Sequence, residues 1–200
     1  MEKSTKIIVG ASAAIVVTTT IYLIFRKNIN VLLKQNLGGY DWFETGLDWY
    51  RNSTTKSEVN KLHPKFQDDV KEFFSWIEKN TDYAIVFNSG HRTFEDQQRM
   101  IDIYGNGAAP VGKSNHNYGF AIDINLRNKK TGKTIMKADK SSYWLNTGIP
   151  QQAKKMGFIW GGDFNNYDPV HFAKDGMPST TQMLALHNAG KVDSNGYIKV

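Results

Sequence analysis

The sequence predicts a small α+β domain with a short antiparallel sheet flanked by helices, preceded by a transmembrane helix. Three observations carry this prediction. Residues 7–25 contain no charged side chain. Residues 64–80 repeat apolar side chains at helical spacing. Residues 120–124, Phe-Ala-Ile-Asp-Ile, alternate with the period of two that is typical of a strand.

Composition restricts the chemistry that the chain can perform. It contains no cysteine, which excludes thiolate ligands, disulfides and cysteine nucleophiles, so any metal must be held by His, Asp or Glu. The net charge of +6 is compatible with simple solubility or with an anionic partner such as a cell-wall polymer, nucleic acid or a lipid surface. Because the basic residues are scattered and form no stripe, we expect no nucleic-acid partner.

The apolar N-terminal segment favours an uncleaved membrane anchor. As a helix, residues 7–25 span about 28 Å, close to the roughly 30 Å hydrocarbon core of a bilayer. The alternative is a cleaved signal peptide, whose apolar region is shorter and is followed by a small-residue cleavage site. Here the small residues 11–13 lie inside the segment instead. Basic residues flank it on both sides, so its orientation stays open.

We therefore expect five parts in the chain. They are a short tail at 1–6, the anchor at 7–25, a juxtamembrane linker at 26–56, a folded domain at 57–178 and a C-terminal extension at 179–200.

The helices of the folded domain follow from local patterns. Pro64 suits the first turn of the helix at 64–80. Thr93 can cap a second helix, with Asp96 completing the capping box, and this helix runs to about residue 104. We expect its Met100, Ile101 and Tyr104 to point inward. Further helices are expected at 150–156, closed by a glycine, and at 181–187.

Strands are expected between these helices. A buried strand at 83–87 leads into the turn before Thr93, and the alternating strand runs from 120 to 127. The remaining strands are expected at 134–136, 158–160 and 168–172.

Two histidines and two aspartates make the candidate site. In the alternating strand Asp123 points away from the apolar face, within reach of the loop that carries His116. A later strand carries His171. Two imidazoles and a carboxylate are a sufficient ligand set for catalytic zinc, with the fourth position left for water. If Asp168 also ligated, that position would close, so we assign it as general base and acid.

Arg92 lies at a strand-to-helix turn, where it can hold a substrate carboxylate or a developing oxyanion. The alternative is a surface arginine that pairs with Glu95 or Asp96.

Three motifs occur in order along the chain. They are Ser-Gly-His-Arg-Thr at 89–93 with Gln97 downstream, Ser-x-His-x-x-Gly-x-Ala-x-Asp at 114–123, and Gly-Phe-Ile-Trp-Gly-Gly-Asp-Phe-x-x-Tyr-Asp-Pro-Val-His-Phe at 157–172. Over roughly residues 57–175 the chain resembles the bacterial and phage zinc peptidases that include D-alanyl-D-alanine carboxypeptidases and L-alanyl-D-glutamate endopeptidases.

The resemblance implies a role for each matching residue. It implies zinc ligation by His116, Asp123 and His171, acid/base catalysis by Asp168, and contact of Arg92 with substrate or intermediate. Asp168, where the carboxypeptidase branch more often has Glu, favours the endopeptidase, endolysin-like branch.

The substrate side of the site is expected at four positions. Besides Arg92, we expect Gln97, His91 and Trp160 to contact substrate. His91 departs from the family pattern, which usually has an aromatic residue there, often Tyr. His91 is also a rival metal ligand, although its place in the motif argues against ligation.

The resemblance predicts a zinc peptidase that cleaves the L-Ala–D-Glu bond of peptidoglycan stem peptides. With the anchor expected at residues 7–25, we expect a membrane-bound monomer whose catalytic domain lies on the periplasmic or extracytoplasmic side, where this substrate is. The alternatives are a D-Ala-D-Ala carboxypeptidase and a non-catalytic, zinc-containing wall-binding module.

Overall fold

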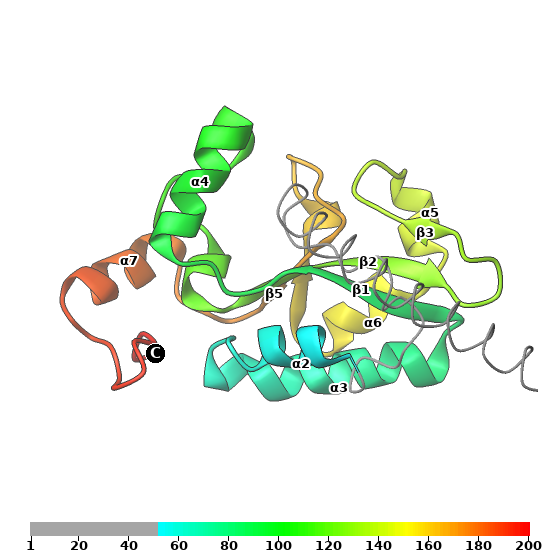
Figure 1. Ribbon diagram of the computed structural model, residues 1–200, viewed down its shortest axis with the longest axis horizontal. Helices are drawn as coiled ribbons and strands as arrows, with labels where there is room; N and C mark the ends of the chain where they lie inside the picture. The colour runs from blue at the N-terminus through cyan, green and yellow to red at the C-terminus, as the bar shows by residue number, and fades with distance from the viewer. Residues whose placement is uncertain (1–51) are drawn as a thin grey trace, which may run out of the picture. The chain divides into compact units, whose positions relative to one another are not determined.

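The computed structural model describes residues 52–200, whose arrangement is shown in Figure 1. The predicted tail, the membrane anchor and all but the end of the linker lie outside the described residues. Within 52–200, no helix is both long enough and apolar enough to cross a membrane.

The centre of the described region is an antiparallel sheet. Its strands follow in the order β1 (Tyr83–Ser89), β2 (Ala121–Asn128), β5 (His171–Lys174) and β4 (Phe158–Trp160). A short β3 (Thr134–Ile135) pairs with β2 beyond the stretch that β5 occupies. The predicted α+β class and antiparallel sheet are therefore confirmed. One strand is displaced, because β5 begins at His171 and leaves Asp168 in the preceding loop.

Two helices cover one face of this sheet (Figure 1). They are α2 (Ser53–Val59), which the sequence did not predict, and α3 (Pro64–Asn80), which has the predicted bounds. The apolar stripe of α3 is fully buried, and the ring centroid of Phe73 lies 5.4 Å from that of Phe172 on β5. Phe120, Ile122 and Ile124 are also fully buried, as predicted for the apolar face of this strand.

The helix α4 (Phe94–Tyr104) begins with the predicted capping box between Thr93 and Asp96. Its predicted inward face is wrong at Tyr104, which is 60% exposed, next to Ile103 at 69%. The helix stands up from one end of the sheet in Figure 1, so only its first turns reach the packed interior. Gln97 is its one buried residue.

The C-terminal half adds three helices. These are α5 (Ser141–Leu145), which was not predicted, α6 (Ile149–Lys155) and α7 (Thr180–Asn188). Gly157 follows α6 in a left-handed conformation, as expected for a glycine that closes a helix. The predicted C-terminal extension shares the hydrophobic core, since Met183 is fully buried and Ile198 is 3% exposed.

Candidate metal centre

The three predicted ligands converge on one face of the sheet. Asp123 and His171 are direct partners in the β2–β5 pair, so their side chains share a face. His116 comes from the 3₁₀ turn η2 (Asn115–Tyr118) before β2. Its Nε2 lies 3.2 Å from Asp123 Oδ1 and 3.2 Å from His171 Nδ1, and the latter two atoms are 3.0 Å apart. Among residues 52–200, these three form the group suited to holding a metal ion.

The protonation states of two ligands suit a cation. His116 Nδ1 lies 2.7 Å from the carbonyl oxygen of Gly90, which can only accept, so Nδ1 carries the proton and Nε2 keeps its lone pair. Burial lowers the pKa of His116 and favours the neutral ring. Burial by itself would raise the pKa of Asp123, but the contacts of its carboxylate with His116 and His171 outweigh burial and hold the pKa well below its usual range.

The geometry fits zinc. With Nδ1 of His116 protonated, His116 Nε2 and Asp123 Oδ1 both present lone pairs, and a cation within reach of both can be held by each of them. Ligands bonded to a tetrahedral zinc at about 2.0–2.2 Å lie roughly 3.3–3.5 Å from one another. The observed separations of 3.0–3.2 Å are close to this range. Three protein ligands also leave one tetrahedral position open.

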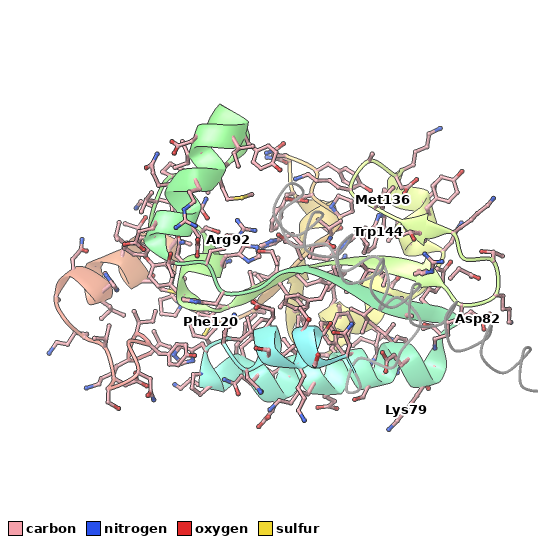
Figure 2. All side chains as sticks on the ribbon, in the orientation of Figure 1. Lys79, Asp82, Arg92, Phe120, Met136 and Trp144 are labelled. Atoms are coloured by element: carbon pink, nitrogen blue, oxygen red, sulfur yellow. The ribbon has the colours of Figure 1, made fainter. Side chains whose placement is uncertain are left out.

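Arg92 supports the metal ligands from the side. Its Nη2 donates to Asp123 Oδ2 at 2.8 Å, the oxygen that does not face the histidines. Its Nε donates to Ser89 Oγ at 2.9 Å and its Nη1 to Gln97 Oε1 at 3.3 Å. In Figure 2, Arg92 lies on the opposite side of the sheet from Phe120 and α3. The surface alternative, pairing with Glu95 or Asp96, is therefore not the arrangement observed, and contact with substrate stays a prediction.

Two of the predicted substrate contacts need correction. Gln97 and Trp160 are each only 1% exposed and offer no surface to a substrate. Gln97 instead joins Arg92 to the loop before η2, since its Nε2 donates to the carbonyl of Ala109 at 2.8 Å. Trp160 Nε1 donates to the carbonyl of Pro169 at 2.8 Å and so supports the segment between Asp168 and His171. The sheet and its loops cover both residues, so their side chains contact neighbouring protein groups and not solvent.

His91 turns toward the C-terminal segment. Its ring centroid lies 6.5 Å from that of Tyr197, and burial lowers the pKa of His91. It is not in the group of described residues suited to a metal, so the structure brings His116, Asp123 and His171 together without it.

Asp168 lies in the loop between the 3₁₀ turn η3 (Gly161–Asp163) and β5. Its backbone is tightly fixed, because its N–H donates to Gly161 O at 2.9 Å and its carbonyl accepts from His171 N at 3.1 Å. A Cβ on Gly161 would lie only 2.3 Å from Asp168 O, so glycine is required there. Asp168 Oδ2 pairs with Lys137 Nζ at 2.9 Å. Asp168 Oδ1 is buried and has no hydrogen-bond partner among the described residues.

Three supporting residues were missed from the sequence. The β1–β2 register shifts between Phe87 and Ser89, and this irregularity places Ser89 opposite Asp123. Asn117 accepts from Gly112 N and donates to the carbonyl of Arg92, so it ties two loops together. Lys137 is the third. Ser89 is the first residue of the first motif, so the sequence could have indicated its role. No local pattern distinguishes Asn117 or Lys137.

The match to known families covers this same site. Residues 108–174 match the family model described as D-alanyl-D-alanine carboxypeptidase. All three ligands and Asp168 fall inside that segment. The matched segment is similar to this peptidase family. The resemblance inferred from the motifs is thereby confirmed, and the donor set of two imidazoles and one carboxylate fits zinc.

One curated relative is a peptidoglycan L-alanyl-D-glutamate endopeptidase, CwlK of Bacillus subtilis (strain 168). It is 35% identical over 104 residues, which are 44% of this chain and 58% of that protein. The chain therefore spans little more than half the length of the curated relative that it matches.

Two solved structures are similar. The Serratia marcescens L-Ala D-Glu endopeptidase ChiX has a TM-score of 0.44 and 18% identity over 60% of this chain and 84% of that one. The vancomycin resistance D,D-pentapeptidase VanY, as a point mutant in complex with Zn(II), has a TM-score of 0.43 and 17% identity over 62% of this chain and 78% of that one. The similarity to the peptidase family therefore rests on the two sequence matches and not on these structures.

Proposed function

We propose that the protein is a zinc-dependent peptidoglycan peptidase that hydrolyses the L-Ala–D-Glu bond of stem peptides. The observation that carries this proposal is the convergence of the His116, Asp123 and His171 ligand atoms inside the segment that matches a peptidase family. The choice of bond is supported by the relative from Bacillus subtilis, and by Asp168 in the acid/base position.

The residues of the chain divide the reaction between them. A bound zinc supplies a Lewis acid that activates water and polarises the scissile carbonyl. Asp168 Oδ1 takes the proton from the attacking water and delivers it to the leaving amine as the C–N bond breaks. Arg92 uses three of its five N–H donors to hold Asp123, Ser89 and Gln97, and the other two, one on each Nη, are available to the developing oxyanion.

The decisive experiment uses a substrate that contains both candidate bonds. Purified disaccharide-pentapeptide muropeptides are digested with the zinc-loaded protein and analysed by mass spectrometry. We expect a fragment that ends in L-Ala and a peptide that begins with D-Glu, and we expect both to disappear with a chelator and return with added zinc. Intact muropeptides after digestion by the zinc-loaded protein would contradict the proposal.

A second candidate activity is that of a D-Ala-D-Ala carboxypeptidase. The description of the matching family model favours it. The same digest separates the two activities, because free D-alanine with an intact L-Ala–D-Glu bond would establish the carboxypeptidase and exclude our first choice.

We also propose that residues 7–25 anchor the chain and place residues 52–200 on the extracytoplasmic side, where the wall is. The support is the uncharged run in the sequence, which lies outside the described residues. A fusion of alkaline phosphatase to the C-terminus tests this, since the reporter is active only outside the cytoplasm. We expect an active reporter in the membrane fraction that carbonate does not extract. An inactive reporter or a soluble fusion would refute the anchor.

A further inference from the structure

Asp168 has a charged partner that none of the motifs contains. Lys137 Nζ lies 2.9 Å from Asp168 Oδ2, and the two residues are 31 positions apart in the sequence. Lys137 belongs to the turn between β3 and α5, and its neighbour Met136 marks this turn in Figure 2. The contact therefore joins two loops that meet only in the folded chain.

The turn that carries Lys137 is held in place from two sides. Within it, Met136 N donates to Asp139 Oδ2 at 2.8 Å and Asp139 N donates to Met136 O at 3.0 Å. From the interior, the fully buried Trp144 donates through Nε1 to Met136 O at 3.2 Å. From the site, Tyr167 Oη donates to the carbonyl of Asp139 at 2.9 Å. Because Tyr167 directly precedes Asp168, the turn and the acid/base loop are coupled.

The two oxygens of Asp168 are unequal as a result. Oδ2 is held by Lys137, while Oδ1 is buried and has no partner among the described residues. A carboxylate rotates easily about its last bond, so one fixed oxygen decides where the other points. The ammonium also offsets the charge of a carboxylate that is only 30% exposed. Lys137 itself is 62% exposed, so its removal leaves no cavity in the core.

We propose that Lys137 is a positioning residue for the reaction. It holds Asp168 by Oδ2 and thereby keeps Oδ1 as the oxygen that exchanges protons with the substrate. This inference rests on the proposed function, because it assigns the partner of the acid/base. A competing role for Lys137, direct capture of a substrate carboxylate, predicts a different kinetic result.

The experiment compares Lys137→Met and Lys137→Arg with the wild type in the zinc-loaded full chain. We expect kcat for muropeptide hydrolysis to fall about 10- to 100-fold in Lys137→Met, with KM within about twofold, because a misplaced acid/base loses part of its contribution. Arginine keeps the charge and should restore most of kcat. Zinc content should stay at the wild-type level in both. Lys133→Met is the matched control, because it removes a lysine of the neighbouring turn between β2 and β3 that has no ion pair among the described residues.

Several results would overturn the inference. An unchanged kcat would do so, and so would a raised KM at constant kcat, which would place Lys137 on the substrate. Loss of zinc in Lys137→Met would show that the lysine acts through the metal ligands instead.

A crystal structure of Lys137→Met separates this inference from the proposed function. If the wild type cleaves no muropeptide, the proposed function fails, and the orientation of Asp168 still decides the role of Lys137. A rotated Asp168 carboxylate in the variant supports positioning, and an unchanged carboxylate refutes it.

Discussion

At the scale of single residues, the metal site depends on hydrogen bonds that leave the right atoms free. The Gly90 carbonyl occupies Nδ1 of His116 and so reserves Nε2 for the metal. Arg92 occupies Oδ2 of Asp123 and reserves Oδ1 in the same way. Lys137 does the same for Asp168 by occupying Oδ2. In each case a neighbouring group holds one atom of the site residue and so selects which other atom is available.

The substitution Asp168→Asn tests the acid/base role at this scale. An amide cannot accept the proton of the attacking water, so we expect kcat for muropeptide hydrolysis to fall roughly 10²- to 10⁴-fold. Zinc content, measured by elemental analysis, should be unchanged, because the three ligands remain. Asp175→Asn, an exposed carboxylate next to β5, is the control and should be neutral. Undiminished hydrolysis by Asp168→Asn would refute the assignment.

At the scale of elements, one glycine allows η2, the turn that carries His116, to lie close to the start of α3. Gly119 follows η2 with a φ of +71°, and its carbonyl accepts from the backbone N–H of His63, the residue that caps α3. A Cβ at this position would lie 2.5 Å from His63 N. The left-handed conformation and the close approach together require glycine.

We expect Gly119→Ala to lower the free energy of unfolding, measured in urea. The left-handed conformation alone costs about 1–3 kcal/mol for a residue with a side chain, and the clash adds to this. Gly157→Ala is a matched control, because Gly157 has a φ of +80° with no atom within 4 Å of a built Cβ. The difference between the two variants measures the clash. If both variants lose the same free energy of unfolding, the close approach of Gly119 to His63 does not by itself exclude a side chain at residue 119.

At the scale of the whole molecule, the C-terminal segment is joined to the site-bearing core through His63. The ring of His63 stacks on Phe120 with centroids 4.3 Å apart, and its Nε2 lies 3.0 Å from the carbonyl of Ile198. Its Nδ1 accepts from Lys65 N, so Nε2 carries the proton and the ring is neutral. Burial lowers the pKa of His63 in the folded chain.

This burial predicts a pH-dependent stability for the metal-free protein. Because the folded pKa of His63 lies below its unfolded value, the unfolded chain binds more protons, and stability is lost as the pH falls below about 6.5. One such histidine contributes a slope of at most about 1.4 kcal/mol per pH unit. We expect His63→Asn, which keeps an acceptor for Lys65 N, to show a smaller slope in urea unfolding between pH 5 and 8.

The control for this pH series is His187→Asn, which changes an exposed histidine of α7. Its slope should match the wild type. A slope in His63→Asn equal to that of the wild type would contradict the role assigned to His63. The pKa of His116 is also lowered by burial, so part of the slope should remain in either variant.

Local patterns in the sequence were sufficient for much of the fold. The stripe of α3, the capping box of α4 and the apolar face of β2 each involve neighbours within a few residues, and all three were confirmed. The ligand set was also predictable, because the alternation of β2 settles the face on which Asp123 lies. The prediction failed at Tyr104, because whether a helix is covered depends on elements far away in the chain.

The sequence by itself determined most of the elements, the donor chemistry and the similarity of residues 108–174 to a peptidase family. Only the tertiary structure decided which atoms of His116, Asp123 and Asp168 are held by neighbours and which are left for the site. The pairing of Arg92 with Asp123 and of Lys137 with Asp168 each spans 31 positions, so no local spacing encodes them. They arise because the sheet brings its strands together in the order β1, β2, β5 and β4, which brings loops distant in sequence onto one face.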